Sequence, residues 1–192
     1  GEMVVYQFED DTLVLHNDLY QINMAESYWN DGIHERMAVF DLYFRNMPFD
    51  SGYAVFNGLK RVIDYVNSFQ FSESDIDYLK SIGYQQDFLS YLKNLKFTGN
   101  IRSMQEGELC FGNEPLLRVE APLIQAQLIE TMLLNIVNFH TLITTKASRI
   151  RQVAHEDMLM EFGTRRAQEA DAALWGARAA YIGGFNSTSN VR

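Results

Sequence analysis

The stretch "EFGTRRAQEADAALWGARAAYIGGFNSTSN", residues Glu161 to Asn190, decides the fold. Its first residues complete "MLMEFG", which predicts a short buried strand; "AQEADAALWGARAAY" predicts an alanine-rich helix and "IGGF" a second short strand. A strand, helix, strand order favours parallel pairing and puts the loops that follow the strands at one edge of the sheet, where ligands commonly bind. We therefore expect "EFGTRR" and "STSN" to face the same pocket.

Upstream of this unit, local signals predict a long helix and a mixed region before it. Pro122 suits the first helical position, and the chain through Ala154 contains no further proline or glycine, so we predict a helix over 122–154. The segment 98–122 predicts two or three strands, the apolar run 37–44 a buried strand, and 17–32 and 53–95 several helices. These patterns predict an α/β fold with an α+β N-terminal region, divided into residues 1–120 and 121–192.

Composition limits the class of protein. The 25 acidic against 16 basic residues give a net charge of −9, which argues against a general nucleic-acid binder and requires any anion site to be local. Cys110 is the single cysteine, so no intrachain disulfide can form, and a reducing cytoplasm is the simplest compartment. The longest uncharged stretch of the predicted long helix, 131–145, is too short to cross a bilayer. The four histidines show no metal-ligand spacing, so we predict no metal held by them.

Arg165 and Arg166 lie side by side at the start of the alanine-rich helix, where the helix dipole disfavours cations. They can be solvated, or they can pair with nearby acids; the candidates are Asp157, Glu161, Glu169 and Asp171. Alternatively, a guanidinium group binds a carboxylate or phosphate through two parallel hydrogen bonds, and Phe162 offers an apolar face to a flat ring. Together these groups suit an aromatic acid.

Five positions are candidates for ligand contact. Phe162 and Tyr20 can be packing residues, or each can offer an aromatic face to a ligand. "STSN" can be a polar turn, or its residues Thr188, Ser189 and Asn190 can cradle ribose or phosphate oxygens.

Several separated segments together resemble one known family. They are "HNDLYQINMAESYW", "FDLYFRNMPFDSGYAVFNGL", "GNEPLLRVEAPLIQAQLIETMLLNIVNFHTLITTKASRIR" and "EFGTRRAQEADAALWGARAAYIGGFNSTSNV". Over nearly the whole chain they resemble nicotinate phosphoribosyltransferase. The resemblance implies transfer of a phosphoribosyl group from phosphoribosyl pyrophosphate to nicotinate, yielding nicotinate mononucleotide and pyrophosphate. It also implies ATP hydrolysis and Mg²⁺ on the pyrophosphate or the ATP.

The same resemblance implies a fold and a set of roles. The chain would be the truncated N-terminal portion of a homodimeric, irregular α/β barrel of the type II phosphoribosyltransferase kind, with dimer contacts in residues 1–120 and the first barrel units in 121–192. Phe162 would stack on one face of the pyridine ring, and Tyr20 of the partner subunit on the other. Arg165 would contact nicotinate, and Arg45 would reach a phosphate.

The sequence departs from the family at two points. The family often has Gly-Thr where this chain has Ser187-Thr188, and its phosphorylated histidine belongs to a later segment, so none of the four histidines here inherits that role. Two other functions stay open: a nicotinamide-using relative, and a non-catalytic dimerisation module. We favour nicotinate because Arg166 stands where that relative typically has glycine, and because "EAPLIQAQLIET" matches the nicotinate enzymes better.

Overall fold

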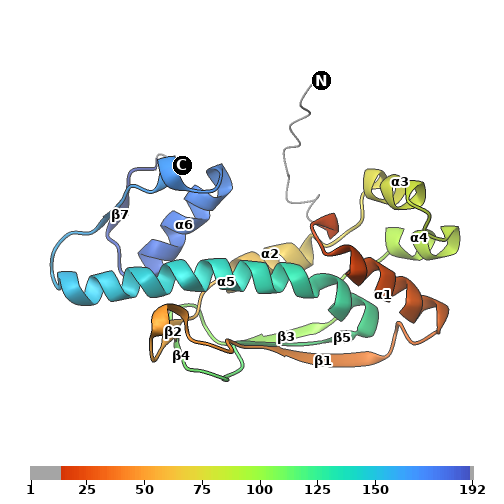
Figure 1. The fold of residues 1–192 in the computed structure, drawn as a ribbon, viewed down its shortest axis with the longest axis horizontal. Helices are drawn as coiled ribbons and strands as arrows, with labels where there is room; N and C mark the ends of the chain where they lie inside the picture. The colour runs from red at the N-terminus through yellow and green to blue at the C-terminus, as the bar shows by residue number, and fades with distance from the viewer. Residues whose placement is uncertain (1–13, 191–192) are drawn as a thin grey trace. The chain divides into compact units, whose positions relative to one another are not determined.

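The computed structural model describes residues 14–190 and shows a mixed α/β fold (Figure 1). Its helices are α1 (Leu19–Asn30), α2 (Leu59–Asn67), α3 (Glu73–Ser81), α4 (Gln86–Lys93), α5 (Leu123–Ala154) and α6 (Ala170–Ile182). The 3-10 helices η2 (Pro48–Asp50) and η3 (Thr164–Arg166) accompany them. The strands are β1 (Met37–Leu42), β2 (Ala54–Val55), β3 (Asn100–Ser103), β4 (Leu109–Cys110), β5 (Leu117–Pro122), β6 (Met160–Glu161) and β7 (Ser187–Thr188).

The strands form three small sheets. One has the order β1-β5-β3, β2 pairs with β4, and β6 pairs with β7. Contacts divide the chain into two compact units, the first comprising residues up to Phe40, Arg61–Ile101 and Val119–Leu133, the second Asp41–Lys60, Arg102–Arg118 and the residues from Leu134 onward. Both units are discontinuous in sequence. The division of the chain at residue 120 stays a prediction.

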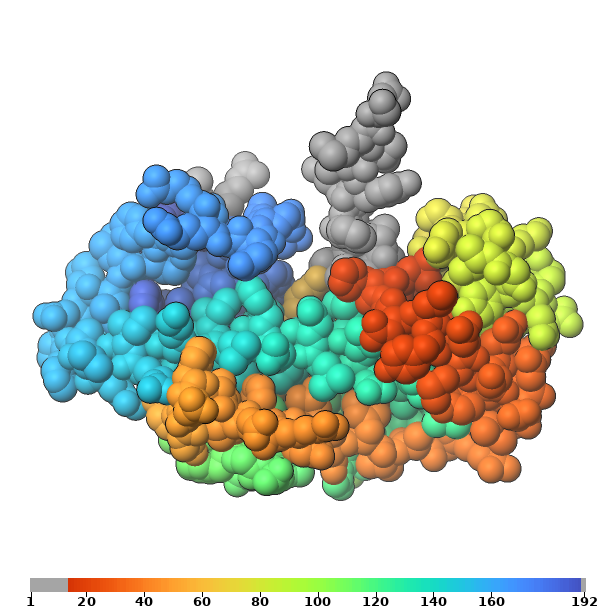
Figure 2. Space-filling model, in the orientation of Figure 1, coloured from red at the N-terminus to blue at the C-terminus, as the bar shows by residue number. Residues whose placement is uncertain are grey.

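The first unit is built from helices with an aromatic core. The side chains of Tyr65, Phe69 and Phe71 are buried and meet edge to face, with ring centroids 6.1 and 5.8 Å apart. Figure 2 shows α3 and α4, in yellow-green, beside the red α1, and the Trp29 and Phe88 rings, 6.0 Å apart, account for this contact. The predicted helices of 17–32 and 53–95 are thus confirmed in α1 to α4, except that the first helix of 53–95 begins only at Leu59, because Ala54 and Val55 pair with β4 as strand β2.

The second unit contains the C-terminal part of α5 with α6 against it (Figure 1). The close approach depends on a small residue, because a Cβ atom at Gly183 would lie 2.5 Å from the Thr144 carbonyl oxygen and 2.6 Å from the Ala147 Cβ. Thr144 also donates a hydrogen bond from its buried hydroxyl to the carbonyl oxygen of Ala179, at 3.0 Å. These contacts fix where α6 ends and where the chain turns toward β7.

The strand, helix, strand prediction is confirmed in its pairing and wrong in two details. β6 and β7 are parallel, with Met160 opposite Ser187 and Glu161 opposite Thr188. The second strand is not "IGGF", because Ile182 ends α6, Gly183 caps it and the chain pairs only from Ser187. The first strand is not buried, since Met160 is 48% exposed on a strand of two residues.

Two other predictions are tested by the upstream elements. The helix expected over 122–154 is confirmed as α5, which begins just after Pro122, the last residue of β5. The strand expected over 37–44 exists as β1, but it is not buried along its length, because Met37 and Val39 are 65% and 60% exposed. Among residues 14–190, no helix is both long and apolar enough to cross a membrane.

Candidate functional site

Phe162 and Arg165 lie where the chain leaves β6. Phe162 directly follows the strand and is 63% exposed, so it is not a core residue within the described chain. Arg165 and Arg166 form the end of η3, four residues before α6 begins at Ala170. The chain therefore presents an exposed aromatic ring and two guanidinium groups on one short turn after a strand.

The arginines of this turn make no ion pair with any residue of the described chain. Within residues 14–190, no side-chain hydrogen bond or salt bridge joins Arg165 or Arg166 to a protein acceptor, although the acidic residues Asp157, Glu161 and Glu169 lie close in sequence. An unpaired guanidinium group retains all its donors for a carboxylate or phosphate of a ligand. The salt-bridge alternative for these two residues is therefore not realised in the structure.

The second predicted segment, Thr188 to Asn190, meets the first across the β6–β7 pair. Thr188 donates from Oγ1 to Glu161 Oε2 at 2.7 Å, the amide of Ser189 donates to the carbonyl oxygen of Glu161 at 2.9 Å, and Thr164 Oγ1 donates to Asn190 Oδ1. The two segments thus meet through direct hydrogen bonds, but the expectation that both face the same pocket is not met by the pocket beside this turn, which Glu161, Gly163 and Arg166 line and residues 187–190 do not. Of the polar groups expected to form a cradle, the Ser189 hydroxyl has no partner in the described chain, whereas the amides of Ser189 and Asn190 are already bonded.

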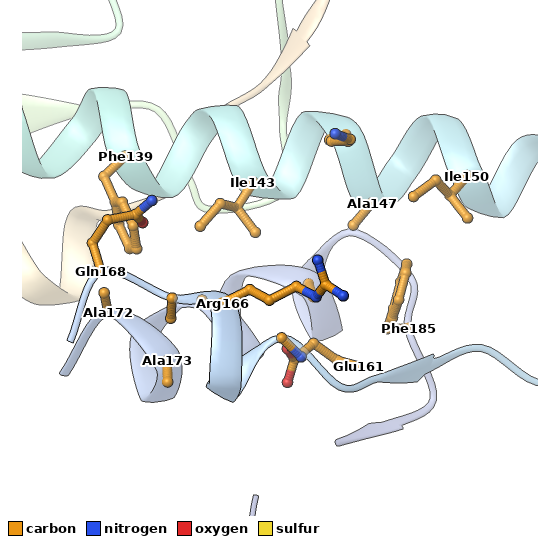
Figure 3. Close-up of a pocket in the computed structure, with 15 residues that line it drawn as sticks. Phe139, Ile143, Ala147, Ile150, Glu161, Arg166, Gln168, Ala172, Ala173 and Phe185 are labelled. Atoms are coloured by element: carbon orange, nitrogen blue, oxygen red, sulfur yellow. The ribbon is translucent and has the colours of Figure 1, made fainter. Parts of the chain in front are cut away.

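A pocket of about 450 Å³ adjoins this turn. Figure 3 shows the Arg166 side chain extended beneath Ile143 and Ala147 of α5, with Phe185 beyond its guanidinium end. Glu161 and Gly163 line the pocket too, and the remaining wall is largely apolar. Arg166, one of the two adjacent arginines expected to suit an aromatic acid, thus lines the cavity, whereas neither Phe162 nor Arg165 is among its lining residues.

Arg45 follows β1 and lines another pocket, of about 350 Å³, with Tyr43, Asn135 and Asn138. This pocket shares no lining residue with the first. Arg45 also has no side-chain partner within residues 14–190. The structure thus leaves its guanidinium group available but does not bring it together with Phe162 and Arg165.

Tyr20 belongs to the first compact unit, whereas the other predicted site residues belong to the second. It lies in the first turn of α1, is 54% exposed and accepts a hydrogen bond at its hydroxyl from Gln21 Nε2 at 3.0 Å. It is therefore a surface residue in this chain, with a ring face available to another molecule.

Sequence reasoning missed the role of Glu161, which it treated only as a possible ion-pair partner. Its carboxylate accepts hydrogen bonds from the Gly163 amide and the Thr188 hydroxyl, so it contacts both segments of the candidate site. The one signal in the sequence was its position at the end of the first predicted strand. The register that places it opposite Thr188 is visible only in the structure.

Comparisons with known proteins agree on one family. The model of the nicotinate phosphoribosyltransferase (NAPRTase) N-terminal domain matches residues 15–138. The chain is 62% identical over 191 residues to the nicotinate phosphoribosyltransferase of Bacillus subtilis, a match that covers 99% of this chain and 39% of that protein. It is 45% identical over 181 residues to the Dictyostelium discoideum protein of the same name, covering 92% of this chain and 31% of that one.

Solved structures give the same result. Human nicotinic acid phosphoribosyltransferase superposes with a TM-score of 0.85 at 37% identity, over 91% of this chain and 36% of that chain. The nicotinate-nucleotide pyrophosphorylase of Pyrococcus furiosus superposes with a TM-score of 0.77 at 20% identity, over 100% of this chain and 41% of that chain, which shows a shared fold alone. The chain thus spans between 31% and 39% of the length of the two curated relatives named above.

Proposed function

Because this chain belongs to the nicotinate phosphoribosyltransferase family, we propose that the protein containing it transfers a 5-phosphoribosyl group from phosphoribosyl pyrophosphate to nicotinate. The nicotinate ring nitrogen supplies its electron pair to the anomeric carbon of the ribose, and the bond from that carbon to pyrophosphate breaks. Pyrophosphate leaves with the bonding electrons. The products are nicotinate mononucleotide and pyrophosphate. This reaction is a step of NAD biosynthesis.

The observation that carries the proposal is the turn after β6, which carries both the exposed ring of Phe162 and, three residues later, Arg165, whose guanidinium group has no partner within residues 14–190. In a chain of net charge −9, a cation that meets no protein carboxylate is available to an anionic ligand. Phe162 offers one face to the pyridine ring, and Arg165 binds its carboxylate through two parallel hydrogen bonds. Both contacts leave the ring nitrogen free to attack.

Three further contacts complete the proposed site. Tyr20 of the partner subunit covers the other ring face in a homodimer, which its exposure on α1 supports. Arg45 takes a phosphate, and the segment of Thr188, Ser189 and Asn190 meets ribose or phosphate oxygens. Catalysis then comes mainly from positioning and from stabilising charge that develops on the leaving pyrophosphate.

The larger architecture is part of the same proposal. The parallel β6–β7 pair, with α6 between its strands, supports an irregular α/β barrel of the type II phosphoribosyltransferase kind, to which this pair contributes two strands. A two-stranded sheet is at best marginally stable by itself, so further strands would complete it. The buried, unpaired Cys110 supports a location in the reducing cytoplasm.

ATP and Mg²⁺ are proposed for the whole protein, and no step is assigned to them here. Within residues 14–190, no group of three histidine, cysteine, aspartate or glutamate side chains could hold a metal ion. We propose that the ion enters with the pyrophosphate group or with ATP, because Mg²⁺ commonly binds through substrate phosphates.

An isotope assay tests the proposed reaction. The whole protein that contains this chain is incubated with phosphoribosyl pyrophosphate, ATP, Mg²⁺ and either labelled nicotinate or labelled nicotinamide. We expect labelled mononucleotide from nicotinate and far less from nicotinamide, because the guanidinium group of Arg165 binds a carboxylate more strongly than a neutral amide. Preference for nicotinamide would favour the related enzyme, and no product from either would favour a non-catalytic dimerisation module.

A further inference from the structure

We infer that Glu161 is a positioning residue, whose carboxylate holds the turn carrying Phe162 and Arg165 at a set distance from the segment 188–190. The inference rests on the proposed function, because it gives Glu161 a task in that site. In this role Glu161 contacts neither substrate, but it determines the positions of Phe162, Arg165 and the segment 188–190, which do.

Glu161 forms hydrogen bonds both to the turn that follows β6 and to the segment 188–190. One carboxylate oxygen accepts from the amide of Gly163, at the start of η3, and the other accepts from Thr188 Oγ1 at 2.7 Å. Its backbone carbonyl oxygen accepts from the amide of Ser189 at 2.9 Å. A single residue of β6 therefore fixes the loop that follows β6 and the segment that follows β7.

Most hydrogen-bonding groups of the Thr188 and Asn190 side chains already have partners within the protein. A threonine hydroxyl has one proton to donate, and that of Thr188 goes to Glu161, while its oxygen accepts from the amide of Asn190 at 3.1 Å. Asn190 Oδ1 accepts from Thr164 Oγ1, and Nδ2 donates to the Ala173 carbonyl oxygen at 3.3 Å. Thr188 and Asn190 thus brace the site beside Glu161, and the Ser189 hydroxyl and the second N–H of Asn190 Nδ2 are the side-chain donors of this segment left for a ligand.

The charge of the Glu161 carboxylate and the absence of a side chain at Gly163 also support this role. The carboxylate of Glu161 would repel a nearby anionic substrate, so we expect it to be present because it stabilises the turn. It accepts two hydrogen bonds, and hydrogen bonds to an ionised group are stronger than those between neutral groups. A Cβ atom at position 163 would lie 2.5 Å from Glu161 Oε1, so glycine there is the residue that allows the carboxylate to reach the turn.

The inference can be tested by steady-state kinetics of the whole protein that contains this chain. For Glu161→Gln and Thr188→Val we expect KM for nicotinate and for phosphoribosyl pyrophosphate to rise roughly tenfold to a hundredfold, the range for loss of a hydrogen bond to a charged group. Because the two side chains share one bond, the double variant should be little worse than either single one. Thr188→Ser keeps the hydroxyl and should restore KM to within a few-fold of the parent value.

Glu156→Gln is the matched control, since Glu156 is an exposed glutamate of the same region without a side-chain partner in the described chain. It should leave both KM values unchanged. Unchanged KM values in Glu161→Gln, with only a lower melting temperature, would overturn the inference, and so would additive effects in the double variant. A parent protein that forms no nicotinate mononucleotide would overturn the proposed function itself, and this inference with it.

Discussion

At the scale of single residues, the environment of a cation decides its role more than its position in the sequence does. Arg118 and Arg165 both belong to an acidic chain, yet Arg118 is bound through two nitrogens to the carboxylate of Asp41, at 2.7 Å each, whereas Arg165 meets no carboxylate within residues 14–190. The hydrogen bonds from Arg118 hold the pKa of Asp41 below its usual value. Arg118 is therefore committed to structure, and Arg165 is available to a ligand.

Substitution of Arg165 by lysine tests this difference. Lysine keeps the positive charge but cannot form two parallel bonds to a carboxylate, so we expect KM for nicotinate to rise about tenfold or more, with little change in the melting temperature. Arg36→Lys is the control, because Arg36 is an exposed arginine without a side-chain partner in the described chain. An unaltered nicotinate KM in Arg165→Lys would count against two-point recognition of the carboxylate.

At the scale of elements, α6 is held by polar contacts as well as by packing. Glu106, in the turn between β3 and β4, accepts from Arg178 of α6 at 2.7 Å and from the Lys60 amide at 3.0 Å. Burial alone would raise the pKa of Glu106, but the hydrogen bonds from Arg178 and from the backbone outweigh it and lower the pKa below its usual value. α6 begins just after the turn that carries Arg165 and ends just before β7, so its anchoring also supports the site.

The pH dependence of stability tests that anchor. A carboxyl group whose pKa is lower in the folded state stabilises the fold above its unfolded pKa, about 4.5, and that contribution is lost as the pH falls through the folded value. We expect Glu106→Gln to reduce the free energy of unfolding at pH 7 by about 1 kcal/mol and to flatten its decline below pH 4.5. Urea unfolding followed by tryptophan fluorescence measures this, because Trp175 lies on α6.

Glu156→Gln again serves as the control and should leave the pH profile unchanged. Equal slopes below pH 4.5 for the parent and Glu106→Gln would show that this pair does not contribute to acid stability.

At the scale of the whole molecule, the proposed homodimer assigns the two ring faces to different subunits. Tyr20 comes from one subunit and Phe162 from the other, so each half of a site can be damaged separately. When Tyr20→Ala and Phe162→Ala polypeptides are unfolded and refolded together, about half of the dimers are mixed, and each mixed dimer has one intact site. We expect the mixture to recover roughly a quarter of the parent activity, although each variant alone is nearly inactive.

Phe162→Ala mixed with Arg165→Ala is the matched control. Both residues would serve the site from the same subunit, so no combination restores an intact site and activity should stay low. Recovery in the control, or none in the Tyr20 mixture, would contradict a site shared between subunits. Light scattering of the same samples gives the oligomeric state directly.

Local signals in the sequence predict most of the helices and suggest the class of ligand. Pro122 and the absence of later breakers predict α5 because such signals act on the residues next to them. Phe162 and Arg165, three residues apart, predict an aromatic acid as ligand for the same local reason. Only the tertiary structure decided that the second strand is Ser187–Thr188 instead of "IGGF", and that Glu161 meets Thr188, 27 residues away. A two-residue strand has almost no pattern of its own, and its register involves contacts between residues far apart in the sequence, such as the hydrogen bond between Thr188 and Glu161, which no local signal encodes.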